Sequence, residues 1–182
     1  MLKTLCLAAA LFLTFPMTEA LAVDIKDPEN TLVIELETGK VYIEMRPDLA
    51  PDHVERIKTL AREDFYDGVV FHRVIPGFMA QTGDPTGTGT GGSSKPDLKA
   101  EFSDAPFERG TAGMARTQAP NSANSQFFIM FDEGSFLNGQ YTVWGQVISG
   151  MEHVDNIKKG EGRSGSVTDP DKMLDVSVAA DL

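Results

Sequence analysis

Apolar and polar side chains alternate near the start of the chain, in a pattern typical of β-strands. In residues 31–37 (TLVIELE) apolar side chains recur at every second position, and residues 40–45 (KVYIEM) repeat this period. The two runs flank Thr38-Gly39, a dipeptide that suits a tight turn. We therefore expect an antiparallel hairpin with one face buried.

A period of three to four residues follows in residues 51–62 and predicts a helix packed by one apolar stripe. Its apolar positions are Val54, Ile57, Leu60 and Ala61. Pro51 at the start and Asp52 in the first turn are typical of a helix N-terminus. A second stripe predicts a short helix over residues 151–159, with Gly160 as its stop.

Short runs of β-branched and aromatic residues predict further strands. Residues 69–75 predict a buried strand that breaks at Pro76-Gly77. Other runs occupy residues 111–115, 126–131, 141–148 and 174–179. Many short antiparallel strands with only two helices favour a closed barrel or a sandwich. No repeat, linker or change of composition divides residues 23–182, so we expect a single domain there.

The first 22 residues predict a cleaved signal peptide. Lys3 gives a positive start, residues 5–15 are almost all apolar, and Ala20-Leu21-Ala22 has the small-x-small form of a signal peptidase site. A retained membrane anchor is the alternative, but an apolar run of 11 residues is shorter than the ~20 that a spanning helix needs. We therefore expect export, to the periplasm or by full secretion, and no stable membrane association after processing.

Charge, cysteine content and glycine spacing exclude several classes of function. The formal net charge is -11, which disfavours binding to nucleic acid or to an anionic membrane. Cys6 is the only cysteine and lies in the predicted signal peptide, so the mature chain has no cysteine nucleophile, disulfide or zinc-cysteine site. Gly87, Gly89 and Gly92 fit the dinucleotide spacing G-x-G-x-x-G, but no helical period follows them. We interpret residues 83–94 as a mobile surface loop.

Candidate chemistry gathers around Arg73, an always-charged residue on an apolar strand. Strand alternation puts Phe71 and Ile75 on its face, and His72 and Val74 on the other face. One interpretation leaves the head of Arg73 in water at a sheet margin. The residues directly after the turn instead indicate a pocket, since large apolar side chains there have little other purpose: Phe78, Met79 and Gln81.

Two motifs give this region a family resemblance. The stretch FHRVIPGFMAQTGD, residues 71–84, resembles the active-site signature of the cyclophilin family of peptidyl-prolyl cis-trans isomerases. Residues 121–129 (NSANSQFFI) are similar to the family pattern NxxxSQFFI. The resemblance covers about residues 31–180 and implies a mostly β fold: a closed eight-stranded antiparallel barrel capped by two α-helices, with a solid interior and a site on an outer face.

The resemblance also implies the site residues. The expected catalytic residues are Arg73, Phe78, Gln81, Phe128, Leu137 and Tyr141. The expected substrate-binding residues are Met79, Ala115, Arg116, Gln126 and Phe136. In this interpretation Arg73 donates a hydrogen bond to the nitrogen of a twisted X-Pro amide while apolar side chains hold the proline ring. No metal or organic cofactor is expected, and the three histidines are given no catalytic role.

Three site positions depart from a common family pattern. Arg116 stands where asparagine is common, Phe136 where many eukaryotic members have tryptophan, and Tyr141 where they have histidine. The last two residues are similar to bacterial members, and they imply weak binding of cyclosporin-type ligands. At Arg116, main-chain bonding to substrate is expected, whereas the role of the side chain is left open.

The sequence thus predicts an exported, monomeric, bacterial-type cyclophilin. It would act on proline-containing peptides and unfolded exported proteins and assist their folding. The alternative is a proline-peptide-binding chaperone whose isomerase activity is incidental. Arg73 argues against that alternative, because an apolar groove alone would not need its charge.

Overall fold

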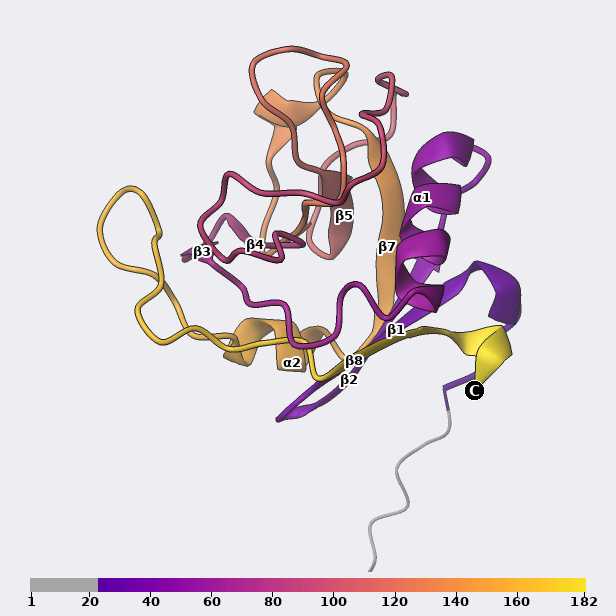
Figure 1. Cartoon of the computed structure of the whole chain (residues 1–182), viewed down its shortest axis with the longest axis horizontal. Coiled ribbons are helices and arrows are strands. Elements are labelled where there is room, and N and C mark those ends of the chain that lie inside the picture. The colour runs from indigo at the N-terminus through magenta and orange to yellow at the C-terminus, as the bar shows by residue number, and fades with distance from the viewer. Residues whose placement is uncertain (1–22) are drawn as a thin grey trace, which may run out of the picture.

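Eight β-strands form one curled, antiparallel sheet in the computed structural model, which describes residues 23–182 (Figure 1). The strands are β1 (Thr31–Leu36), β2 (Gly39–Met45), β3 (Arg73–Ile75), β4 (Met79–Thr82), β5 (Thr111–Met114), β6 (Phe127–Met130), β7 (Val143–Ser149) and β8 (Asp175–Val178). Their spatial order is β3-β4-β6-β5-β7-β2-β1-β8. The predicted signal peptide, Met1–Ala22, lies outside the described residues.

The predicted hairpin is confirmed as β1 and β2, which pair from Thr31 opposite Glu44 to Leu36 opposite Gly39. Gly39 has φ +145°, and a side chain at this position would collide with the ring of His153. The expectation of one buried face holds for β2 but not for β1. Val33, on the face expected to be open, is only 3% exposed.

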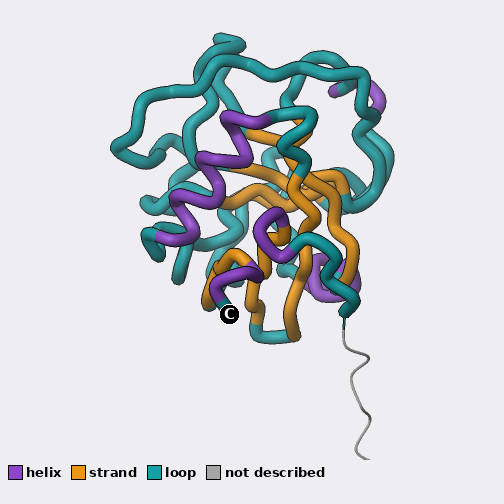
Figure 2. Tube along the Cα trace, turned by 90° about the vertical axis from the view of Figure 1, so that its right-hand side faces the viewer, coloured by secondary structure: helices purple, strands orange, loops and turns teal. Residues whose placement is uncertain are grey.

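Residues 23–182 contain two α-helices. Helix α1 (Pro51–Arg62) has the predicted bounds and packs against β8. Helix α2 (Met151–Asn156) is shorter than predicted, because Ile157 already has an extended backbone and Lys158 donates its N–H to the Asp171 carboxylate at 2.7 Å. Figure 2 shows the strands in one curled layer, with α1 crossing it and most loops gathered at one end. In residues 23–182 no helix is both long and apolar enough to cross a membrane.

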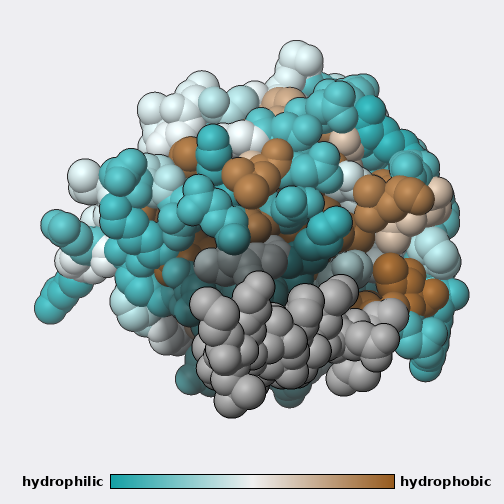
Figure 3. Space-filling view, turned by 90° about the horizontal axis from the view of Figure 1, so that it is seen from below, coloured by the Kyte–Doolittle hydropathy of each residue, from teal (hydrophilic) through white to brown (hydrophobic). Residues whose placement is uncertain are grey.

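Aromatic side chains fill the main core. The ring of Phe127 packs edge-on against Tyr66 at 5.5 Å and against Trp144 at 5.4 Å. All three are fully buried, and strands from across the sheet contribute the surrounding aliphatic side chains. A second, smaller cluster includes Met79 and Phe128 and belongs to the surface described below. On the face shown in Figure 3, outside the part drawn in grey, exposed apolar groups form separate patches among hydrophilic ones.

The sheet is open, so the expected closed barrel is not confirmed. In the described residues, β3 and β8 are edge strands that no ladder joins. Residues 165–173 run beside residues 68–74 instead, and make backbone hydrogen bonds such as Gly68 N–H to Met173 O (2.8 Å) and Val74 N–H to Gly165 O (2.7 Å). Positive φ angles at Gly165 and Asp169 interrupt the extended conformation that a ladder would need.

Strand β3 is also shorter than predicted, and the alternation predicted around Arg73 is wrong in part. Phe71 is 1% exposed and joins the main core together with Val74, whereas Arg73 and Ile75 are half-buried. The reason is that only an isolated bridge, at Val70, pairs the residues before Arg73. Without a ladder, the period of two does not extend back to Phe71.

Candidate active site

A hairpin and its neighbouring strand present the signature residues on one surface. Strands β3 and β4 pair Arg73 with Gln81 across a turn at residues 76–78, where Gly77 has φ +69°. Strand β4 in turn pairs with β6, which sets Gln81 opposite Phe128. Because side chains directly opposite on one face are neighbours, this register gathers a cation, an amide and an aromatic ring within a few ångströms.

These residues line a cavity of about 410 Å³. Its lining residues are Arg73, Phe78, Met79, Gln81, Ala115, Arg116, Phe128, Phe136, Leu137, Gln140 and Tyr141. The side chains of Met79, Phe128 and Leu137 are buried and form an apolar floor. Phe136 stands at the rim, 65% exposed, with its ring 5.4 Å from that of Phe78. Such a floor suits a compact apolar ring.

The guanidinium of Arg73 is held from two sides. Its Nε donates to the carbonyl oxygen of Ser164 at 3.0 Å, and Nη1 donates to Oε1 of Gln81 at 3.0 Å. Nη2 has no hydrogen-bond partner within the described part of the chain, and the side chain borders the cavity. The arrangement therefore fixes the plane of the guanidinium and leaves N–H donors available for a bound ligand.

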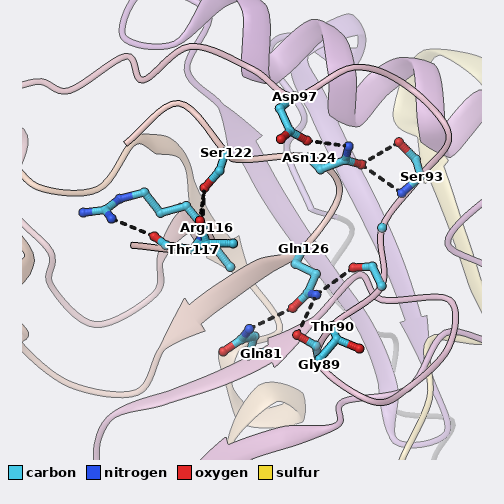
Figure 4. A pocket seen from close by; sticks show the side chains of 13 residues that line it. Gln81, Gly89, Thr90, Ser93, Asp97, Arg116, Thr117, Ser122, Asn124 and Gln126 are labelled. Atoms are coloured by element: carbon cyan, nitrogen blue, oxygen red, sulfur yellow. Dashed lines mark hydrogen bonds between the residues drawn. The ribbon is translucent and has the colours of Figure 1, made fainter. Parts of the chain in front are cut away.

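A second cavity, of about 500 Å³, adjoins the first and shares Gln81, Ala115 and Arg116 with it (Figure 4). Its other lining residues are Gly89, Thr90, Gly91, Gly92, Ser93, Asp97, Thr117, Ser122, Asn124 and Gln126. Gln126 lines only this second cavity, so it is the one predicted site residue that does not line the apolar cavity. Because they share lining residues, the two cavities form one continuous surface.

Gln126 links the two cavities. Its Nε2 donates to the carbonyl oxygens of Gly89 (3.2 Å) and Gly91 (2.8 Å), and its Oε1 accepts from Nε2 of Gln81 at 2.9 Å. Gln81 then accepts from Arg73. Figure 4 shows Gln126 between Gln81 and residues 83–94, the glycine-rich loop. A relay of amides thus ties the orientation of Arg73 to the loop.

The glycine-rich loop is built around Asp84, a buried carboxylate. Oδ2 accepts from the N–H groups of Gly89 (2.7 Å) and Gly91 (3.0 Å), and Oδ1 accepts from that of Thr86 (2.8 Å). Burial raises the pKa of Asp84, but these hydrogen bonds outweigh burial and lower the pKa to about 2. The prediction of a mobile surface loop did not anticipate that residues of this loop form a wall of the second cavity. The available signal in the sequence was Asp84, which precedes alternating Thr and Gly residues.

The Arg116 side chain has a definite place, which the sequence did not reveal. Its guanidinium lies over the ring of Tyr141 at 4.4 Å, and Phe102 lies at 5.9 Å from the same group. Nη2 donates to the carbonyl oxygen of Gln140 at 2.8 Å. Phe102 and Gln140 were not predicted as site residues.

Asn124 and Arg56 organise the far wall of the second cavity and were also missed. Asn124 accepts from Ser93 through Oδ1 at 2.7 Å and donates to Asp97 at 3.1 Å. Arg56 is buried in α1 and donates to the carbonyl oxygens of Asn124 (3.2 Å) and Pro96 (2.7 Å). In the helical pattern Arg56 was indistinguishable from a solvent-facing arginine, so only the tertiary structure identifies its role.

The histidines do not form a ligand set. Within residues 23–182 no group of three or more His, Cys, Asp or Glu side chains could hold a metal ion. His72 is buried beside the glycine-rich loop, and burial lowers its pKa below the ordinary 6.5. Neither of its ring nitrogens has a hydrogen-bond partner in the described structure.

Comparisons with known proteins point to one family. The family model described as "Cyclophilin type peptidyl-prolyl cis-trans isomerase/CLD" matches residues 31–178. A probable peptidyl-prolyl cis-trans isomerase of Brucella suis is 57% identical over 187 aligned residues, which cover 96% of this chain and 95% of that protein. Peptidyl-prolyl cis-trans isomerase B of Bacillus subtilis is 44% identical, covering 69% of this chain and 89% of its own.

Solved structures are similar as well. The cyclophilin AquaCyp293 from Hirschia baltica has a TM-score of 0.77 at 29% identity, covering 86% of this chain and 76% of that one. A cyclophilin-type isomerase of Cryptosporidium parvum, crystallised in the presence of the dipeptide Ala-Pro, has a TM-score of 0.74 at 28% identity, covering 81% of this chain and 98% of its own.

Proposed function

This chain belongs to the cyclophilin-type peptidyl-prolyl cis-trans isomerase family, and from that premise we propose that it accelerates rotation about X-Pro bonds in exported proteins and so assists their folding. The observation that carries the proposal is the position of Arg73. Its guanidinium is fixed by Ser164 and Gln81, and Nη2, which has no partner among residues 23–182, lies beside an apolar floor.

Isomerisation requires no atom transfer. Rotating the X-Pro bond breaks amide resonance against a barrier of ~18 to 20 kcal/mol, and the nitrogen regains its lone pair in the twisted state. A fixed cationic donor at that nitrogen stabilises the twisted amide more than the planar one, which is the requirement for catalysis. Arg73 supplies such a donor, and the cavity keeps it partly out of water.

Two parts of the site hold the substrate. The apolar floor of Met79, Phe128 and Leu137 suits the proline ring, and Phe78 and Phe136 close its rim. The Ala-Pro dipeptide crystallised with the Cryptosporidium relative supports proline-containing peptides as the ligand class. The second cavity takes the flanking chain, so that only one side of the bond rotates. A ~10⁵-fold acceleration corresponds to lowering the barrier by about 7 kcal/mol, which a charge-assisted hydrogen bond together with restraint of the substrate can supply.

Export to the periplasm is part of the proposal and rests on the first 22 residues. Their positive start, apolar run and small-x-small ending fit a cleaved signal, and the rest of the chain contains no cysteine. Unfolded exported proteins would then be the clients. Full secretion is the alternative destination. Weak binding of cyclosporin-type ligands is expected because Phe136 offers no indole N–H at the rim.

The test combines activity and location. The chain is expressed with residues 1–22 intact, the cell is fractionated, and the recovered protein is sequenced from its N-terminus. We expect Val23 as the first residue, recovery outside the cytoplasm, and catalysed cis-trans exchange of an Ala-Pro peptide by NMR. An unprocessed cytoplasmic chain would overturn the export proposal, and peptide binding without exchange would favour a proline-peptide chaperone.

A further inference from the structure

The apolar cavity carries two positive charges and no negative one. Arg73 and Arg116 are the only charged residues among its lining side chains. This is unusual for a chain with a formal net charge of -11. Arg73 is accounted for by the proposed chemistry. The positive charge of Arg116 has no role in that chemistry and is available to an acidic group of a bound ligand.

Arg116 is held rigidly by neutral groups. Nε and Nη2 donate to the carbonyl oxygen of Gln140 at 3.2 and 2.8 Å, and Nη1 donates to those of Thr117 (2.9 Å) and Gln118 (3.3 Å). The guanidinium is stacked on Tyr141. Carbonyl dipoles and an aromatic face orient the cation but do not cancel its charge. One hydrogen of Nη2 is left over by this geometry, because a guanidinium has five N–H donors.

Carboxylates of the protein do not neutralise Arg116. Within residues 23–182 it forms no salt bridge, whereas Arg46, Arg62 and Arg109 each pair with an acidic side chain. Asp97, the one acidic residue lining the second cavity, is engaged with Asn124 at 3.1 Å. Figure 4 shows Asp97 beside Asn124, well apart from the guanidinium of Arg116, which points away from it at the left of the view.

We propose that Arg116 is a specificity-determining residue that favours substrates with an acidic side chain within two residues of the proline. This inference rests on the proposed isomerase function of the same site. Because Arg116 borders both cavities, a peptide whose proline sits on the apolar floor carries its flanking residues past the guanidinium. A half-buried, pre-oriented cation attracts a carboxylate without the entropy loss of fixing its own side chain.

Peptides of matched length test the proposal. Each contains one Ala-Pro bond and carries Glu, Gln or Lys at one of the positions two before, one after or two after the proline. Catalysed exchange is measured by NMR without a coupling protease, so that no second enzyme adds its own preference. At low ionic strength we expect kcat/KM in the order Glu, Gln, Lys at one or more of these positions, with Glu ahead of Gln by about two- to fivefold. High salt should reduce this ratio.

Variants assign the preference to Arg116. In Arg116→Gln the ratio of Glu to Gln peptides should fall to about one, and in Arg116→Glu the Lys peptide should become the best substrate. Lys26→Gln, an exposed position near the N-terminal end of the described chain, changes the net charge equally and should keep the wild-type ratio. Equal turnover of Glu and Gln peptides by the wild type, or an unchanged ratio in Arg116→Gln, overturns the inference. Absence of exchange even with Gln peptides would instead refute the isomerase function.

Discussion

Arg73 donates a hydrogen bond from Nη1 to Oε1 of Gln81 at 3.0 Å, and the two residues face each other across the β3–β4 pair. The contact is the last step of a relay that starts at the buried carboxylate of Asp84 and passes through the glycine-rich loop and Gln126. The cation that we place at the reacting bond is therefore oriented by groups several residues away. Each link of this relay can be tested separately.

Removal of the cation should abolish most of the catalysis. In Arg73→Ala we expect kcat/KM to fall by about 10²- to 10³-fold, because a fixed donor is lost from a site that is partly shielded from water. Peptide binding should weaken only modestly, since the apolar floor remains. Exchange NMR measures turnover, and a titration of the same peptide measures affinity. Wild-type turnover in this variant would refute the mechanism.

A break in the amide relay should have a smaller effect. Gln126→Leu removes the acceptor of the Gln81 amide and the donor to Gly89 and Gly91, so Arg73 is less well oriented. We expect about a fivefold loss of kcat, equivalent to one net hydrogen bond. Gln118→Leu serves as the control and should keep wild-type kcat, because this exposed residue contacts Arg116 only through its backbone carbonyl, which the substitution retains. Equal kcat in Gln126→Leu and the control would contradict the relay.

Asp84 should stabilise the folded chain as well as the loop. Asp84→Asn replaces an ionised acceptor of several N–H bonds and should lower the free energy of unfolding by about 1–3 kcal/mol at neutral pH. Hydrogen exchange at the amides of Gly89 and Gly91 should accelerate. Asp104→Asn, on an exposed residue, is the matched control. Since the folded pKa of Asp84 is about 2, its contribution is present above the ordinary 3.8 and is lost as the pH falls toward 2.

His72 should make stability depend on pH in a higher range. Its folded pKa lies below 6.5, so the unfolded chain binds the proton first as the pH falls. The contribution of His72 is therefore complete above 6.5 and declines as the pH drops below that value. We expect His72→Gln to show a smaller decrease in the free energy of unfolding from about pH 7 to about pH 5. Urea unfolding followed by the fluorescence of Trp144 measures it, and a decrease as large as in the wild type would exclude the role of His72.

Local periodicity predicted the elements whose pairing partners are close in the chain. The hairpin of β1 and β2 and the bounds of α1 were predicted correctly, because turn chemistry and one apolar stripe determine them. The early end of α2 and the open edge of the sheet were not predicted. Both depend on hydrogen bonds between distant segments, such as that from Lys158 to the Asp171 carboxylate, which leave no periodic signal in the sequence.

The candidate site was predictable where it depends on local sequence motifs. Motif resemblance named the residues of the apolar cavity, among them Phe128, whose chain neighbour Phe127 lies in the core. Phe102 and Arg56 gave no such signal. Phe102 comes from a segment without a regular period, and Arg56 takes a place in the helical pattern that usually faces water. What each of them contacts is decided by loops that only the folded chain brings near.

The hydrogen bond from Arg73 to the carbonyl oxygen of Ser164 joins residues 91 positions apart in the chain. The ribosome synthesises Arg73 and the apolar floor before it synthesises Ser164, whose carbonyl orients the guanidinium. A partly synthesised polypeptide can therefore contain Arg73 and the whole apolar floor before the carbonyl that orients the guanidinium exists. Activity should appear late in biogenesis, once the final fifth of the chain has emerged and docked.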